Sequence, residues 1–110
     1  MPRRESSIEA SCRRAAERAD CALLKLWPII VGIPDRILMG PNRLIAFVEL
    51  KRPGKVPTAI QDYWHRRLRK WGFVVLVISD LEDFKLQLQS ATDKAHNSPR
   101  RHSAARGATK

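Results

Sequence analysis

The sequence predicts a mixed α/β domain in which helices pack against a small mixed sheet. Segments with helical periodicity alternate with short apolar runs, and proline or glycine separates most of them. Apolar residues make up 44% of the chain, which is enough for a small core. A length of 110 residues favours one domain over two separately cored ones. The expected order of elements is helix, strand, strand, helix, strand, helix.

The first expected element is an amphipathic helix from about Ser6 to Leu24. Apolar residues recur in it every three or four positions, and charged residues lie mostly between them. On one helix, Cys12 and Cys21 would lie roughly 13 Å apart at about 1.5 Å of rise per residue, beyond the ~7 Å reach of a disulfide. We therefore expect free thiols, as in a reduced cytoplasmic protein.

Two strands and a second helix should follow. The run Ile37–Met39 reaches a turn at Gly40-Pro41-Asn42, and the branched and aromatic residues of Leu44–Lys51 predict the next strand. Thr58 is a candidate helix cap, and Gly72 stands where that helix would stop. Apolar residues repeat along the helix at three- to four-residue intervals: Ile60, Trp64, Leu68 and Trp71. We expect this stripe to pack into the core.

The third strand, Phe73–Ile78, is apolar at every position, which predicts a place in a sheet covered on both faces. The helix that separates it from Leu44–Lys51 predicts a right-handed crossover and a parallel strand pair. Ser79 followed by Glu82 is a capping-box pattern for a last helix that ends near Leu88.

The chain is strongly basic. It has 21 Lys and Arg against 11 Asp and Glu, a formal net charge of +10, which favours a polyanionic partner such as nucleic acid. Residues 91–110 have no large apolar side chain, so we expect a disordered basic tail behind a domain of residues 1–90. No apolar run approaches the roughly 20 residues that cross a membrane, and charges interrupt the N-terminal segment where a signal peptide would be apolar. A cytoplasmic protein is therefore expected.

Three charged residues stand near the ends of the two strands that the predicted turn joins. Strand alternation puts Glu49 and Lys51 on one face, and a hairpin would bring Asp35 opposite a position near Glu49. Converging carboxylates make an oxygen-rich site of the kind that Mg²⁺ or Mn²⁺ prefers. Lys51 could orient or deprotonate a water molecule and offset the charge of a phosphodiester transition state. The ordinary alternatives are an exposed ion pair for Glu49 and Lys51 and a turn aspartate for Asp35.

These residues belong to a longer pattern. It consists of Gly32-Ile33-Pro34-Asp35, thirteen residues, Glu49-Leu50-Lys51-Arg52-Pro53-Gly54, and then Gln61, Leu68 and Gly72-Phe73. From roughly Glu5 to Phe84 the pattern closely resembles the VRR-NUC domain (virus-type replication-repair nuclease) of the PD-(D/E)xK nuclease superfamily. The resemblance implies a restriction-endonuclease-like α/β core. It also implies divalent-metal-dependent hydrolysis of DNA phosphodiester bonds, often in branched, flapped or junction DNA.

The resemblance implies roles for individual residues. Asp35 and Glu49 would bind the metal, Mg²⁺ or Mn²⁺, and the carbonyl of Leu50 would be a further ligand. Lys51 would be the catalytic lysine. Gln61 matches the glutamine that the family carries on the following helix, and we expect it in the catalytic site.

On the first helix, the family's glutamate matches Glu9, which would be a catalytic and metal-binding acid. Glu5, one turn earlier, is the poorer candidate, and either could instead be an ordinary solvated charge. The chain departs from the family at Ala19-Asp20, where a Gly-Gly pair is common, and at Pro28–Val31, where the loop is more apolar than usual. These departures concern a substrate-facing loop or a dimer contact and leave the signature acids and lysine unchanged.

The candidate DNA contacts are basic residues near the expected site and on the second helix: Arg36, Arg52, Lys55, Arg66 and Lys70. For the helix cluster, phosphate contact and a merely solvated face are equally compatible with the sequence. Trp64 and Trp71 are expected in the core rather than stacked on bases, and the role of Trp27 is left open. His65, His96 and His102 show no metal-ligand or triad spacing.

The sequence thus predicts a small metal-dependent DNA endonuclease of the VRR-NUC type, structure-specific and encoded by a phage or prophage. We expect a homodimer, because about 90 ordered residues bury a modest core and a single domain has one active site. The alternative is a non-catalytic nucleic-acid-binding module of the same fold, although binding alone does not require the two acids and the lysine. A general coating protein would need an aromatic platform that the sequence lacks.

Overall fold

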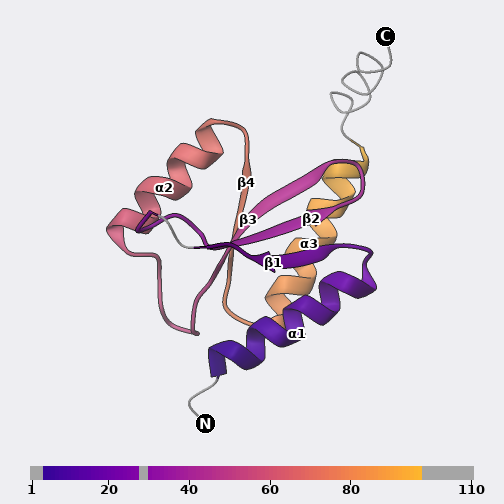
Figure 1. The fold of residues 1–110 in the computed structure, drawn as a ribbon, viewed down its shortest axis with the longest axis horizontal. Coiled ribbons are helices and arrows are strands. Elements are labelled where there is room, and N and C mark those ends of the chain that lie inside the picture. Colours follow the sequence, from indigo (N-terminus) through magenta and orange to yellow (C-terminus); the bar gives the residue numbers. More distant parts are fainter. Residues whose placement is uncertain (1–3, 28–29, 98–110) are drawn as a thin grey trace.

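The chain forms a four-stranded mixed sheet that three helices accompany. The computed structural model describes residues 4–27 and 30–97, with side chains from Ser7 onward. Its elements are α1 (Arg4–Arg18), β1 (Ala22–Lys25), β2 (Arg36–Gly40), β3 (Leu44–Leu50), α2 (Ala59–Lys70), β4 (Val74–Ile78) and α3 (Leu81–His96). The strand order is β1-β2-β3-β4 (Figure 1). β2 pairs antiparallel with both β1 and β3, and β4 pairs parallel with β3. The predicted α/β class and the parallel strand pair are confirmed.

The N-terminal helix is shorter than expected, and a strand follows it. Asp20 adopts a left-handed backbone conformation, with φ of 62°, and the Cys21 N–H donates to the Ala16 carbonyl at 2.8 Å. Together these features end α1 before the apolar run of β1 begins. The prediction that the helix continues through that run was wrong, and β1 was missed. Cys12 and Cys21 are free, as predicted. Both are buried, and only Cys12 lies in a helix.

The centre of the chain follows the prediction closely. β2 and β3 form the expected hairpin. Thr58 caps α2 and forms a capping box with Gln61, and Gly72 follows the helix at a φ of 97°. In β4, the consecutive residues Val75 and Leu76 are both buried. Because consecutive strand residues point to opposite faces, β4 is covered on both of them, as predicted.

Only part of the predicted apolar stripe on α2 is buried. Leu68 is buried, whereas Ile60 is 44% and Trp71 55% exposed. The prediction that Trp71 packs in the core was therefore wrong. The reason is that, among the described residues, α2 packs on β4 and on the loop at Gly32, which leaves its outer face exposed.

The last helix begins and ends later than predicted. Its cap is Asp80 rather than Ser79, because the Asp80 carboxylate accepts the backbone N–H of Asp83 at 2.8 Å. The predicted end near Leu88 was also wrong, since α3 runs to His96. Ala91 and Ala95 are 6% and 5% exposed and continue the core, which shows that small side chains suffice where helices pack closely. Residues 98–110 of the predicted basic tail lie outside the described residues.

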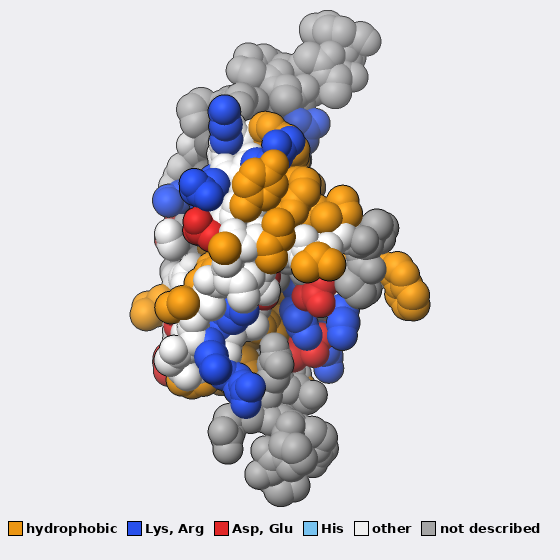
Figure 2. All heavy atoms as spheres, turned by 90° about the vertical axis from the view of Figure 1, so that its left-hand side faces the viewer, with side chains coloured by type: hydrophobic (Ala, Val, Ile, Leu, Met, Phe, Trp, Pro, Cys, Tyr) orange, Lys and Arg blue, Asp and Glu red, His pale blue; other side chains and the backbone are white. Residues whose placement is uncertain are grey.

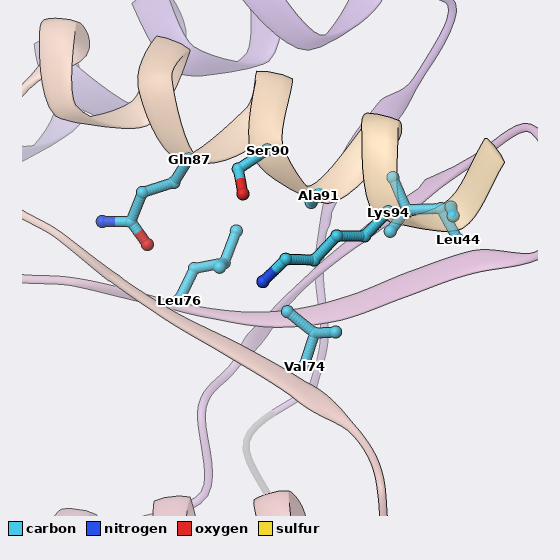
Figure 3. Close-up of a pocket in the computed structure, with 8 residues that line it drawn as sticks. Leu44, Val74, Leu76, Gln87, Ser90, Ala91 and Lys94 are labelled. Carbon is cyan, nitrogen blue, oxygen red and sulfur yellow. The ribbon is translucent and has the colours of Figure 1, made fainter. Parts of the chain in front are cut away.

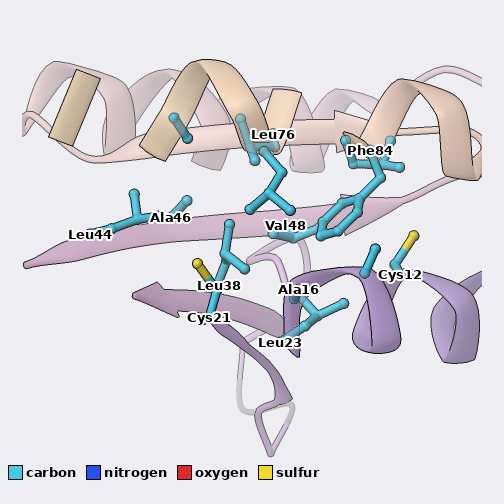
Figure 4. Packing of buried hydrophobic residues seen from close by; sticks show 14 of the residues in the cluster. Cys12, Ala16, Cys21, Leu23, Leu38, Leu44, Ala46, Val48, Leu76 and Phe84 are labelled. Carbon is cyan, nitrogen blue, oxygen red and sulfur yellow. The ribbon is translucent and has the colours of Figure 1, made fainter. Parts of the chain in front are cut away.

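The core lies on one face of the sheet, between the strands and the pair α1 and α3. Alternate residues of β3 point into it: Leu44, Ala46, Val48 and Leu50. Leu38 from β2 and Phe84 from α3 meet Val48 there, and both are fully buried (Figure 4). α2 lies apart from this pair of helices (Figure 1). The intervening residues of β3, Glu49 among them, therefore face away from the core.

The loop before β2 is anchored by a glycine that other residues should not replace. Gly32 has a φ of 98°, and a Cβ there would lie 2.7 Å from Ile60 Cγ1 and 2.9 Å from Trp64 Cδ1. We expect Gly32→Ala to destabilise the fold by about 2 kcal/mol or more, from backbone strain and overpacking together. Gly54→Ala is the control, because its φ is 85° but nothing lies within 4 Å. Equal losses in denaturant unfolding would show that the contact with α2 is unimportant.

Candidate active site

The β2–β3 hairpin brings the two predicted metal-binding acids to one end of the sheet. Arg36 is paired with Val48 in the antiparallel register, so the next pair outward is Asp35 and Glu49. The Leu26 N–H donates to the carbonyl of Asp35 at 2.6 Å and extends the β1–β2 pairing to this position. Directly opposed residues of an antiparallel pair project to the same face. The backbone register thus places Asp35 opposite Glu49, while their carboxylates accept hydrogen bonds from different partners, Arg36 and Gln61.

Glu49 is held from α2 by a glutamine that also caps that helix. The amide Nε2 of Gln61 donates to Glu49 Oε2 at 3.2 Å. The Oε1 of the same amide accepts the backbone N–H of Thr58 at 2.9 Å, within the capping box. Because the amide oxygen is occupied by that donor, its NH₂ group has to face the carboxylate. The start of α2 and the orientation of Glu49 are thus structurally linked.

His65 is a neighbour of Glu49 that the sequence pattern did not predict. Its side chain is 1% exposed, and its Nε2 lies 3.7 Å from Glu49 Oε1. Burial lowers the pKa of His65, and nearby Arg69 and Lys51 act in the same direction. The signal that could have found it is its spacing, since His65 follows Gln61 by one helical turn and shares its face.

Lys51 lies just beyond β3, where its backbone N–H donates to the Ile78 carbonyl at 2.8 Å. It lines a hollow of about 400 Å³ together with Glu49. The other residues of this hollow come from the end of β3, the following loop and the start of α2: Leu50, Arg52, Lys55, Val56, Thr58 and Gln61. The structure thus gathers one predicted acid, the predicted lysine and glutamine, and two of the predicted DNA contacts.

Arg36 connects the first helix to the start of β2. Its guanidinium donates to Asp35 Oδ1 at 2.9 Å and to Glu9 Oε1 at 3.1 Å. The hydrogen bond from Arg36 holds the pKa of Glu9 below its ordinary value, against the opposing effect of burial. Glu9 is therefore connected to Asp35 by way of Arg36, which donates to both carboxylates. The side chain of Glu5 lies outside the described residues.

These contacts bear on the prediction that Arg36 binds DNA. Arg36 is 9% exposed and is bonded to two carboxylates, a setting that suits charge balance within the site better than contact with a phosphate. Arg66 and Lys70, by contrast, are exposed on α2. Arg66 pairs with Asp62 at 3.2 Å.

Aromatic rings on α2 and at its C-cap surround an arginine. Arg67 lies over Tyr63, Trp64 and Trp71, with its Cζ 4.8 to 5.5 Å from the ring centroids. Figure 2, which faces the side of the molecule where α2 lies, shows hydrophobic side chains gathered beside Lys and Arg. A second hollow, of about 340 Å³, lies between α3 and β4, where Lys94 extends over Val74 and Leu76 (Figure 3). No acid lines that hollow, so it has no part in the site.

Among the described residues, no group of three or more His, Cys, Asp and Glu side chains could hold a metal ion. A metal at Asp35 and Glu49 would therefore use at most two protein carboxylates and take its remaining ligands from backbone oxygen, water or substrate. Mg²⁺ is commonly bound in this way. This donor set of carboxylate and carbonyl oxygens fits Mg²⁺ or Mn²⁺, which prefer hard oxygen ligands.

Comparison with known proteins shows which solved structure has a similar fold. No family model matches the chain. A solved structure described as a VRR_NUC domain superposes with a TM-score of 0.70 at 24% identity, over 77% of this chain and 94% of that one. The chain therefore has the fold of a VRR_NUC domain, and the fold that the sequence resemblance implied is confirmed.

A phage protein is similar to this chain in sequence. "Putative nuclease p44" of Acyrthosiphon pisum secondary endosymbiont phage 1 is 47% identical over 47 residues. The match covers 43% of this chain and 50% of that protein, so the chain spans about half of the relative's length. In the described part of the chain, no helix combines the length and apolarity needed to cross a membrane.

Proposed function

We propose that the chain is a divalent-metal-dependent endonuclease that hydrolyses phosphodiester bonds in branched, flapped or junction DNA. The proposal is carried by the register of the β2–β3 hairpin, which sets Asp35 opposite Glu49, with Lys51 two residues farther along. The VRR_NUC fold and the phage relative that is named a nuclease support the same chemistry.

Asp35, Glu49 and the carbonyl of Leu50 would hold Mg²⁺ or Mn²⁺. When bound, such an ion polarises a phosphoryl oxygen and lowers the pKa of coordinated water. Two carboxylates and a carbonyl leave room for water and a phosphate oxygen in a shell of about six ligands. A phosphate of the substrate would approach these residues through the hollow that Glu49, Leu50 and Lys51 line.

The protein's own residues would divide the remaining work. Lys51 holds the attacking water against the phosphate and offsets the charge that develops on it. Gln61 fixes the carboxylate of Glu49 through its amide. Arg36 and Glu9 form an ion pair beside Asp35, and Arg36 balances the negative charge of both acids.

DNA would be held chiefly by charge. Arg52 and Lys55 line the hollow next to Lys51, and the net charge of +10 favours a polyanion throughout. Arg66 and Lys70 on α2 would contact phosphates farther along the strand. Contacts of this kind position the nucleic acid without reading its sequence, as expected of an enzyme that selects DNA by structure.

The proposal includes a homodimer in the cytoplasm of a bacterium or a phage-infected cell. The phage relative supports this setting. Exposed apolar side chains surround a hollow of about 490 Å³ at the β2–β3 turn and the start of β4, and they include Met39, Ile45, Phe73 and Val74. A surface of this kind would suit a second copy of the chain.

The direct test uses labelled flap, junction, single-stranded and duplex DNA with the purified chain, in Mg²⁺, in Mn²⁺ and in excess EDTA. We expect cleavage of at least one branched substrate with either metal and none in EDTA. Binding without cleavage under every condition would overturn the proposal and indicate a non-catalytic binding module.

A further inference from the structure

The imidazole of His65 is fully buried although one of its nitrogens has no hydrogen-bond partner in the described chain. It is among the largest fully buried side chains of the described chain, and its Nε2 makes no hydrogen bond there. A buried polar nitrogen without a partner destabilises a fold, whereas leucine or methionine would fill the same volume at no such cost. The atom that lacks a partner is also the one that faces the site, since it lies 3.7 Å from Glu49 Oε1.

The two oxygens of Glu49 face two donors on one side of α2. Gln61 donates to Oε2 at 3.2 Å, and His65, one turn later, lies opposite Oε1. A distance of 3.7 Å is too long for a hydrogen bond, and a movement of about half an ångström would bring the pair within the usual limit of ~3.2 Å. Hydrogen bonds in empty active sites are often long in this manner and shorten when the site is filled.

We propose that His65 is a positioning residue for Glu49, whose Oε1 accepts a hydrogen bond from the His65 Nε2–H while Oε2 accepts one from Gln61. The two bonds fix the plane of the carboxylate, and thereby the direction from which it could bind a metal. Carboxylates that bind metals are generally held by such outer partners. This inference rests on the proposed function.

Neighbouring groups do not offer His65 another partner for this nitrogen. Arg69, one turn farther along α2, donates to the Val75 carbonyl at 2.8 Å, and a guanidinium is in any case a donor only. The ammonium of Lys51 is likewise a donor only. The charge of Asp62 also acts on His65, where it raises the pKa, but the Asp62 carboxylate pairs with Arg66 at 3.2 Å. Glu49 is therefore the acceptor that the geometry supplies.

The tautomer of His65 can be read from the wild-type protein without any metal. A long-range ¹H–¹⁵N spectrum distinguishes a proton on Nε2 from one on Nδ1, and the signal of His65 is assigned by its loss in His65→Gln. We expect the Nε2–H form. A proton on Nδ1 instead would leave a bare nitrogen facing the carboxylate and would overturn the inference, whatever the variants do.

Metal affinity provides the second readout. We expect His65→Leu to weaken the binding of Mn²⁺ alone, measured by calorimetry, by about tenfold or more, the usual effect of removing such a partner. Thermal unfolding without metal should be unchanged or improved. His65→Gln keeps a donor and should retain most of the affinity, and His96→Leu, at an exposed histidine, should retain all of it.

The outcomes separate this inference from the proposed function. If wild type binds Mn²⁺ and cleaves DNA but His65→Leu binds Mn²⁺ equally well, the inference is wrong and the nuclease stands. Equal losses in His65→Leu and His65→Gln would also overturn it, because they would show that shape rather than the donor matters. A wild-type chain that binds no Mn²⁺ would overturn both.

Discussion

Replacing Glu49 by alanine is expected to abolish metal-dependent cleavage of DNA while the chain stays folded. The side chain is 14% exposed and faces away from the main core, so its removal takes away a metal ligand without opening a large cavity. Loss of the charge stabilisation that a bound metal supplies is worth several kcal/mol, or about a thousandfold or more in rate. Single-turnover cleavage in Mg²⁺ measures this loss, and circular dichroism checks the fold.

A matched variant controls for the change in charge. Asp62 is an acid on the exposed side of α2, paired with Arg66, and its side chain is 57% exposed. Asp62→Ala removes the same charge from the same region and should cleave at close to the wild-type rate. A folded Glu49→Ala protein with normal cleavage would end the nuclease proposal.

The arrangement of the acids could be predicted because it depends on local pattern. A glycine-proline turn joins two short strands, and the register of that hairpin follows from the number of residues between them. Asp35 and Glu49 are then brought together by the backbone alone. The capping residue Thr58 and the stop at Gly72 were equally local, and the structure confirms both.

What could not be predicted depends on contacts between distant segments. β1 was missed because the left-handed residue that ends α1 is an aspartate, which gives no signal of the kind that glycine gives. The continuation of α3 depends on alanines whose burial only the packed core reveals. His65 looks unremarkable in sequence and becomes part of the site only when α2 lies beside β3.

Arg36 illustrates the same limit for charged residues. Its position next to Asp35 suggested a phosphate contact, yet the side chain is enclosed and paired with Glu9, 27 residues earlier in the chain. Sequence spacing gives the sign of a charge but not its partner. For that reason, the role of a basic residue in this chain is inferred from its burial and its ion-pair partners rather than from its place in the sequence.

Replacing Lys51 by arginine should cost at least about a hundredfold in cleavage rate, the usual scale for acid–base or electrostatic groups. An ammonium is compact and can hold or release a proton, whereas a guanidinium is larger, planar and effectively always charged. If Lys51 only neutralised Glu49, arginine would serve as well. If it holds the attacking water against the phosphate, arginine should fail even though Mn²⁺ and DNA bind nearly as in wild type.

Lys55→Arg is the control for that experiment, because Lys55 lines the same hollow and would serve only as a phosphate contact. Replacing this lysine by arginine should preserve both DNA binding and the cleavage rate, since a phosphate of the DNA backbone can pair with either cation. The decisive quantity is the single-turnover rate at saturating metal and DNA, which separates chemistry from binding. Near-normal turnover in Lys51→Arg would show that this lysine contributes only its charge. It would then favour the alternative that Glu49 and Lys51 form an ordinary ion pair at the end of a strand.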